Sequence, residues 1–216
     1  MKFVYLTIDD GPSKRAWQLL DYLDAHKFGA ILFCVGKNLI KRPDIAMRAI
    51  RGGFIIGNHS YDHSDFNKLS QVHARRQIER TDRIISELYT RSGIQRPARY
   101  FRFPYGNHGR TARAKQSNQA ILRDLGYSAP FHAPNLDWRW DVDVGDWHVH
   151  KKNRARKLST AKKKLKGLRP ESILDLHDQT ANLQTLLFQE LCEEVMHLGY
   201  AFHENARFHE LAGLSH

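Results

Sequence analysis

Short, nearly continuous apolar runs alternate with amphipathic segments along the chain, and this alternation restricts the possible folds more than any other feature. Such runs are typical of parallel strands that are covered on both faces. Their alternation with helical segments predicts an α/β fold with a parallel sheet of about seven strands, open or closed into a barrel. The candidate strands are Phe3–Asp9, Ala30–Val35, Phe54–Asn58, Tyr100–Phe103, Asp141–Val144, Ile173–His177 and Tyr200–His203.

The segments between these strands carry helical periodicity. Proline suits the first turn of a helix, and glycine suits the position just after its end. The expected helices run roughly from Lys14 to His26, after Pro43, from Ser70 to about Arg91, up to Gly126 and up to Gly199.

Size and composition indicate one globular domain over residues 1–216, because 41% of the 216 residues are hydrophobic. No apolar run approaches the length of a membrane-spanning helix. Met1 leads directly into a strand-like run, so the sequence as given predicts a cytoplasmic protein; an exported form with its leader trimmed is the alternative. Cys34 and Cys192 are expected to be buried thiols.

Polar residues gather where the predicted strands end. In parallel α/β folds the carboxyl ends of the strands meet at one end of the sheet, where active sites form. Each motif alone has an ordinary explanation, such as a helix-capping turn or a chance histidine pair, but their joint placement predicts one site. The motifs are Asp9-Asp10 in "TIDDGP", His59 and His63 in "NHSYDH", Arg102 in "FRFPYG", Asp146-Trp147 in "WDVDVGDW", and His177 in "LDLHD".

The pair His59 and His63 points to metal chemistry. Two histidines four residues apart can direct both imidazoles at one ion from a helical turn or a tight loop. The signal is weak by itself, because the chain has 13 histidines.

These five motifs, in this order, resemble those of the polysaccharide deacetylases of carbohydrate esterase family four, which include chitin, chitooligosaccharide and peptidoglycan deacetylases. The resemblance runs from the first strand to about Phe202 and includes the stretch "PDIAMRAIRGGFIIGNHSYDHSDFNKLS". It implies a distorted barrel of parallel strands in a single domain. It also implies a hydrolase that removes acetyl groups from N-acetylated sugars, in oligo- or polysaccharides containing N-acetylglucosamine.

The resemblance implies a metal site made of Asp10, His59 and His63. Two imidazoles, a carboxylate and water are the ligands of a catalytic zinc site. One divalent ion is expected, with zinc first and cobalt, nickel or manganese as alternatives. Ser60 and Asp62 are expected to brace the histidine loop, and a direct role of Asp62 stays open.

The resemblance also assigns the remaining roles. The second carboxylate of "TIDDGP" would act as the general base on water at the metal, and a histidine would donate a proton to the departing amine. The implied catalytic set is Asp9 as base, His177 as acid, Arg102 holding Asp9, and Asp146 orienting His177. The implied substrate-binding residues are Tyr105 (through its backbone N–H), Trp147 and Pro104.

One position departs from the family pattern. The family usually has a leucine two residues before the catalytic histidine, as part of the acetyl pocket, and this chain has Asp175. The departure leaves open a hydrolase of the same fold acting on O-acetyl groups or on non-sugar amides. A separate alternative is a non-catalytic binder that keeps the fold and holds an anionic glycan with a basic helix. A binder would be expected to have lost at least one of the motif residues, and all are present.

The positive charge is concentrated in one segment, Lys151–Arg169, which holds 10 of the 34 Lys and Arg residues and no acid. Leu158, Ala161, Leu165 and Leu168 lie at helical spacing, which predicts an amphipathic helix. Its basic side is either simply solvated or attracts an anionic or lipid-linked glycan. Without aromatic stacking residues it is not expected to bind nucleic acid sequence-specifically. The sequence does not indicate an oligomeric state.

Overall fold

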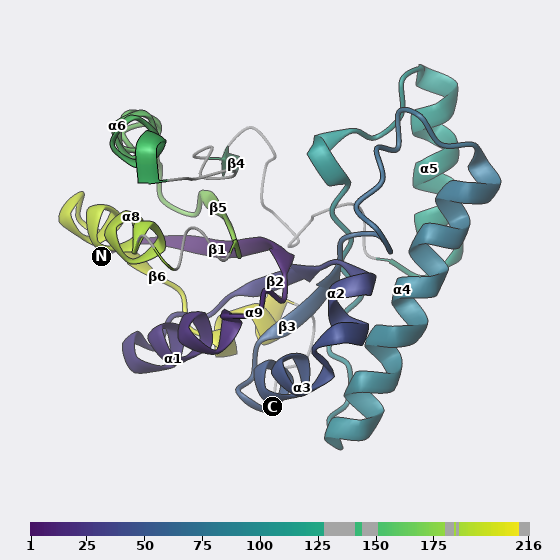
Figure 1. The fold of residues 1–216 in the computed structure, drawn as a ribbon, viewed down its shortest axis with the longest axis horizontal. Helices are drawn as coiled ribbons and strands as arrows, with labels where there is room; N and C mark the ends of the chain where they lie inside the picture. The colour runs from purple at the N-terminus through teal and green to yellow at the C-terminus, as the bar shows by residue number, and fades with distance from the viewer. Residues whose placement is uncertain (128–140, 144–150, 180–183, 185, 212–216) are drawn as a thin grey trace.

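The computed structural model describes residues 1–127, 141–143, 151–179, 184 and 186–211 (Figure 1). Its strands are β1 (Lys2–Gly11), β2 (Ile31–Cys34), β3 (Ile55–Asn58), β4 (Asp141–Asp143), β5 (Ile173–His177) and β6 (Tyr200–Phe202). Its α-helices are α1 (Ala16–His26), α2 (Gly36–Lys41), α3 (Pro43–Arg51), α4 (Gln71–Ser92), α5 (Ala112–Asp124), α6 (Arg154–Leu165), α8 (Leu187–His197) and α9 (Asn205–Leu211).

The described strands form one parallel sheet in the order β3-β2-β1-β5-β4, and β6 pairs with the start of β1. The α/β class and the parallel pairing are therefore confirmed. The segment expected as a strand at Tyr100–Phe103 makes a single bridge to the rest of the described chain, between Phe101 and Asn58. Within the described part of the chain no pairing joins β4 to β3, so closure into a barrel stays a prediction.

Side chains on β1 alternate between two environments, as strand geometry requires. Val4, Leu6 and Ile8 belong to the main apolar core, which also includes buried residues of α1, α3, α4, α6 and α8. Tyr5 packs instead in a second cluster on the other face, with Ile31, Phe33, Ile55 and Ile173 of neighbouring strands and Phe208 of α9. Thr7 and Asp9 share the face of Tyr5, so this face changes from apolar to polar toward the carboxyl end of the sheet.

Local sequence explains where the helices begin and end. The Ser70 side chain accepts a hydrogen bond from the His73 N–H at the start of α4, and Gly93 ends that helix with a positive φ of 69°. Pro43 opens α3, as expected. The sequence did not predict α2 and α9, which are short.

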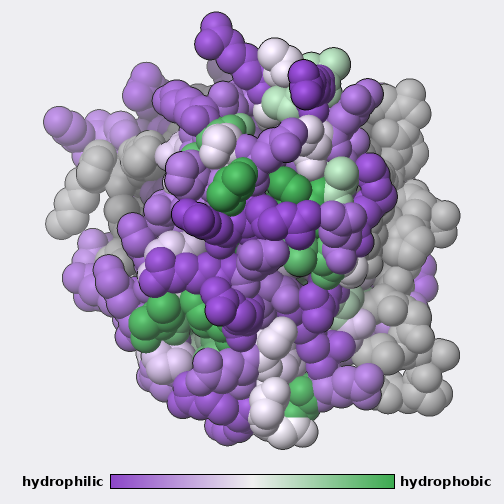
Figure 2. Space-filling view, turned by 90° about the vertical axis from the view of Figure 1, so that its right-hand side faces the viewer, coloured by the Kyte–Doolittle hydropathy of each residue, from purple (hydrophilic) through white to green (hydrophobic). Residues whose placement is uncertain are grey.

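The helices lie around the sheet as Figure 1 shows, with α4 and α5 on one flank and α6 and α8 on the other. The α4 side of the molecule is mostly hydrophilic, with small scattered apolar patches (Figure 2). The predicted amphipathic basic helix is confirmed as α6, because Ala161 and Leu165 are buried and Leu158 packs against the main core. Cys34 and Cys192 are both buried, as predicted.

Within the described ranges, no helix is both long enough and apolar enough to cross a lipid bilayer.

Candidate active site

The sheet face that carries Tyr5 becomes polar at its carboxyl end, and this end brings together residues that are far apart in the sequence. The parallel register pairs Thr7 with Asp175 and Asp9 with His177 on strands β1 and β5. Residues two apart on a strand point to the same face, so Asp175 and His177 join Thr7 and Asp9 there. The cluster therefore forms two layers, with Asp9 and His177 above Thr7 and Asp175.

The three expected metal ligands converge beside this cluster. The His63 Nε2 atom lies 3.1 Å from Asp10 Oδ1, and the His59 Nε2 atom lies 3.6 Å from the same oxygen. One donor atom from each residue falls within 4.8 Å of the others. His59 Nδ1 lies 2.9 Å from the Arg102 carbonyl oxygen, which leaves Nε2 as the nitrogen directed at the site. A backbone partner of this kind orients metal-binding histidines generally.

The charge environment of Asp10 also suits a cation site. Burial raises the pKa of Asp10, but hydrogen bonds and charge from His59 and His63 outweigh burial and hold this pKa well below its usual range. The carboxylate is therefore ionised at neutral pH and available as a ligand.

The backbone around the site adopts conformations that non-glycine residues seldom use. Asp10, Ser60, His63 and Tyr105 have φ values of 71°, 63°, 62° and 59°. Positive φ costs free energy for such residues, and strained positions cluster at functional sites. The Asn38 side chain of α2 donates a 2.9 Å hydrogen bond to the Asp10 carbonyl oxygen, which helps to hold that conformation.

The loop that carries the two histidines is braced from within. Asn58 accepts from the Ser60 N–H at 2.9 Å, and Ser60 Oγ accepts from the His63 N–H at 3.0 Å. Gln77 of α4 accepts from the backbone N–H groups of Tyr61 and Asp62. The Asp62 carboxylate accepts from the Ser64 hydroxyl, so this residue braces the loop, and the described donor set at the metal site does not include it.

Arg102 connects two buried carboxylates. Its Nη1 donates to Asp9 Oδ1 at 2.9 Å and also to Asp175 Oδ1. Asp175 Oδ1 accepts a further hydrogen bond from the Thr7 hydroxyl at 3.1 Å. The guanidinium carbon lies 4.7 Å from the centre of the Phe33 ring. Arg102 therefore contacts Asp9 as expected, while its contact with Asp175 was not foreseen.

His177 faces the same cluster. One imidazole nitrogen lies within 4.8 Å of carboxylate oxygens of both Asp9 and Asp175. His177 is only partly buried, so it can meet a ligand. Asp146 and Trp147, expected to orient His177 and to line the acetyl pocket, lie outside the described residues.

Two residues of the "FRFPYG" segment differ in their exposure to solvent. Tyr105 is 68% exposed and its ring lies 4.5 Å from the His63 ring, centre to centre. Pro104 is buried and is not among the described residues that line the cleft. The fixed φ of Pro104 suits the turn that presents Tyr105, and the substrate contact expected of Pro104 stays a prediction.

An open cleft of about 700 Å³ connects these groups. Its lining includes the metal-ligand set, Asp9, Arg102, Asp175, His177 and Tyr105. It also includes residues that sequence reasoning missed: Lys37, Asn38, Lys41, His108 and Gln179. No motif marks these positions, because they reach the cleft only through the packing of α2 and of the loops. A cleft with titratable groups at strand ends is the expected setting for chemistry.

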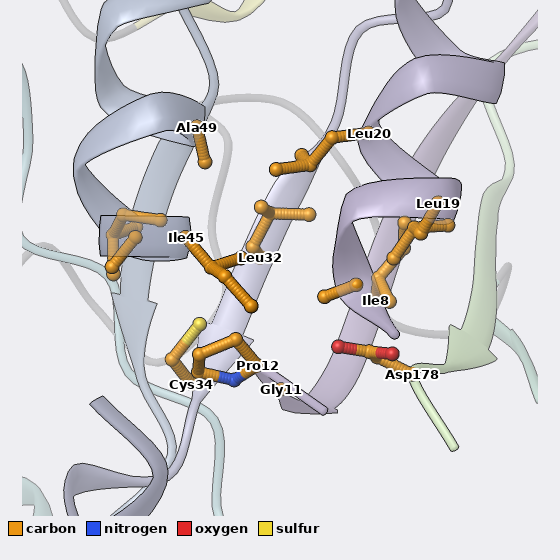
Figure 3. Close-up of a pocket in the computed structure, with 13 residues that line it drawn as sticks. Ile8, Gly11, Pro12, Leu19, Leu20, Leu32, Cys34, Ile45, Ala49 and Asp178 are labelled. Carbon is orange, nitrogen blue, oxygen red and sulfur yellow. The ribbon is translucent and has the colours of Figure 1, made fainter. Parts of the chain in front are cut away.

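A separate small cavity of about 20 Å³ lies on the helix-covered side of the sheet, behind the Gly11-Pro12 turn (Figure 3). Leu20, Leu32 and other apolar side chains line it, and the Asp178 carboxyl lies at its edge. Asp178 Oδ2 accepts from the Ser13 N–H at 2.7 Å, and the Asp178 N–H donates to the Asp9 carbonyl oxygen at 2.9 Å. Burial raises the pKa of Asp178. Asp178, which sequence analysis did not single out, ties the end of β5 to the end of β1, where Asp9 and Asp10 lie.

The fold and the site together define a class: a parallel α/β protein with an Asp-His-His donor set in a cleft at the carboxyl ends of its strands. Within this class the chain belongs to the polysaccharide deacetylase family, whose model matches residues 1–129. The matched region contains the first three motifs, whereas Asp175 and His177 lie beyond it.

Curated relatives in this family are named as deacetylases. A peptidoglycan-N-acetylglucosamine deacetylase of Bacillus cereus is 31% identical over 147 residues, which make up 67% of this chain and 46% of that protein. A chitooligosaccharide deacetylase of Rhizobium leguminosarum bv. trifolii is 27% identical over 176 residues, 81% of this chain and 71% of that protein. The chain thus spans less than half the length of the first relative.

Solved structures show the same fold. Peptidoglycan deacetylase PdaC of Bacillus subtilis matches with a TM-score of 0.70 and 25% identity, over 98% of this chain and 92% of that chain. A pseudoenzyme of carbohydrate esterase family four from Bacillus anthracis, BA3943, matches with a TM-score of 0.69 and 21% identity, over 93% and 63%. The second likeness concerns the fold alone, and fold alone does not decide whether a chain turns over substrate.

Proposed function

We propose that this chain is a metal-dependent hydrolase that removes acetyl groups from N-acetylated sugars in glycans containing N-acetylglucosamine. The observation that carries the proposal is the convergence of Asp10, His59 and His63 at one point, next to the buried carboxylate of Asp9. The names of the relatives support the substrate class.

The donor set fits a divalent ion. Two imidazole nitrogens and one carboxylate oxygen leave room for further ligands, as catalytic zinc sites require. Zinc is the first candidate, and cobalt, nickel or manganese suit the same donors. When bound, such an ion supplies Lewis-acid activation of a water molecule and of the substrate carbonyl.

Asp9 is placed to accept the proton of the attacking water. Its Oδ2 lies 3.7 Å from His59 Nε2, on the side of the metal ligands, while Arg102 binds the other oxygen, Oδ1. The carboxylate is thus oriented by a charge-assisted hydrogen bond, with one oxygen directed at the site. This division explains why "TIDDGP" has two acids, since Asp10 binds the ion and Asp9 moves the proton.

His177 is placed to donate a proton to the departing amine. It lies beside Asp9 on the neighbouring strand and lines the cleft. Tyr105 would contribute its backbone N–H to the developing negative charge on the carbonyl oxygen, as oxyanion-stabilising groups do. The products are acetate and a free amino sugar.

Acetate release tests this function. The purified chain, with zinc added, is incubated with N-acetylglucosamine oligomers, peptidoglycan fragments and acetylated xylan, with and without a chelator. We expect acetate from the first two substrates, loss of activity with chelator, and recovery when metal is restored. Release from xylan alone would favour an O-acetyl esterase. No release from any substrate would favour a non-catalytic binder, as the fold shared with a pseudoenzyme allows.

We also infer that the glycan is anionic, from the charge on α6. Arg156 and Lys163 on this helix are exposed, whereas Arg154 and Lys162 pair with Glu190 and Glu194 of α8. Lys166 and Arg169, just beyond the helix, are exposed as well. Lys164 donates to the carbonyl oxygen of Asp143, a residue that lines the cleft, so the basic surface continues to the cleft edge.

Charge reversal on this surface provides a prediction. Lys163→Glu/Lys166→Glu should lower kcat/KM on an anionic glycan by about tenfold at low salt, and salt should weaken the native activity in the same way. Activity on neutral chitooligosaccharides should stay within about twofold of the native value. The matched control is Arg83→Glu/Arg91→Glu, two exposed arginines of α4. Equal losses in both variants, or a salt-independent rate, would show that α6 does not select the substrate.

A further inference from the structure

Asp175 is a buried carboxylate that the proposed mechanism does not use. It is 7% exposed and lies on β5 two residues before His177, on the same face. The leucine of the family pattern could not make any of the contacts that Asp175 makes here.

Those contacts form a continuous chain that ends at the general base. The Thr7 hydroxyl donates to Asp175, Arg102 donates to Asp175, and Arg102 donates to Asp9 at 2.9 Å. The parallel register fixes the strands that carry these groups, because Thr7 pairs with Asp175 and Asp9 pairs with His177. The same oxygen of Asp175, Oδ1, therefore accepts from the Thr7 hydroxyl of β1 and from the Arg102 guanidinium.

Charge balance supports a fixed position for Arg102. Arg102 is 8% exposed and its guanidinium packs over the Phe33 ring, so little water can replace a missing partner. Both carboxylates contact Nη1, and the second contact limits the rotation that a single one would leave to the guanidinium.

One possible donor atom from each of Asp9, Asp175 and His177 also lies within 4.8 Å of the others, close enough for the three to hold a metal ion. Arg102 contacts both of these carboxylates, so a positive charge already lies at this position. A second cation there would be repelled, which favours a positioning role for Asp175 over a role as metal ligand.

We propose that Asp175 is a positioning residue that holds Arg102 and, through it, fixes the orientation of the Asp9 carboxylate. This inference rests on the proposed function of Asp9 as general base. In this chain the general base Asp9 would be held by a series of contacts: Thr7 contacts Asp175, Asp175 contacts Arg102, and Arg102 contacts Asp9.

A double-mutant cycle tests whether Asp175 acts through Arg102. Asp175→Asn keeps the size of the side chain and removes its charge. We expect kcat to fall about tenfold with KM within about twofold, because a positioning residue such as Asp175 would not itself bind the substrate. In an Arg102→Met background the same substitution should change kcat by less than about twofold. Asp175→Glu should recover part of the lost rate, and Asp21→Asn, at an exposed ion pair of α1, serves as control.

A second measurement does not need turnover. Nitrogen-15 NMR of arginine guanidinium groups in the metal-free protein should show separate Nη signals for Arg102, because two carboxylates hinder its rotation. Asp175→Asn should merge these signals, and Arg102→Lys identifies them. If they merge but the native chain releases no acetate from any glycan, the proposed function fails while the contact chain stands.

Four results would overturn the inference. One is an unchanged Arg102 spectrum in Asp175→Asn. Another is an equal loss of kcat in the native and Arg102→Met backgrounds. The third is a change in preference among formyl, acetyl and propionyl substrates, which would place Asp175 against the acyl group instead. A second metal equivalent that disappears with Asp175→Asn would likewise contradict the positioning role.

Discussion

Asp9→Asn is expected to lower kcat by about 1000-fold while the protein still binds one divalent ion. An amide cannot accept the proton of the attacking water, and positioned general bases contribute about 100- to 10000-fold to rates. Asn keeps the shape of Asp and an oxygen that can accept from Arg102, so the fold should persist. The measurements are acetate release and zinc binding by calorimetry, at matched zinc concentrations.

The result distinguishes Asp9 as a general base from Asp9 as a metal ligand. If zinc affinity falls together with activity, Asp9 is itself a ligand and the division of labour with Asp10 is wrong. Asp44→Asn, at an acid in the first turn of α3, controls for the general loss of one negative charge. Unaltered kcat in Asp9→Asn would reject the role as base.

His59→Ala is expected to abolish both metal binding and turnover. His59 is 2% exposed and its Nε2 lies 3.6 Å from Asp10 Oδ1, so its removal takes away one of the three donor atoms that converge there. A ligand at about 100 times its dissociation constant stabilises a folded protein by about 2.7 kcal/mol. The native chain should therefore gain thermal stability with zinc, and the variant should not.

The control for this experiment is His197→Ala, at an exposed histidine near the end of α8. It should keep both the zinc-induced shift in Tm and the activity. A zinc-induced shift in His59→Ala equal to that of the native chain would mean that the ion binds elsewhere.

Much of the site could be predicted because strand ends are local features. An apolar run followed by Asp9-Asp10 or by His59 is visible in the sequence, and parallel strands place their carboxyl ends together. Six of the seven strand predictions matched strands of the structure within a few residues, and β5 matched at both ends. The expected strand at Tyr100–Phe103 is not seen among the described residues, where only Phe101 forms a bridge.

The role of Asp175 could not be predicted in this way. In the sequence it is an acid within an apolar run, which leaves both an outward and an inward orientation open. Only the register with Thr7, 168 residues away, places it beside Arg102. Asn38 and Gln77 were missed for a similar reason, since they act on backbone groups that only packing brings near.

The sequence by itself determined the α/β class and the order of the motifs, because these depend on periodicity and on the chemistry of single side chains. Its resemblance to a known family predicted the three metal-binding residues. The tertiary structure alone decided which carboxylate meets which cation. Hydrogen bonds extend only about 3 Å, so pairings such as Arg102 with Asp9 and Asp175 are set by how distant strands align.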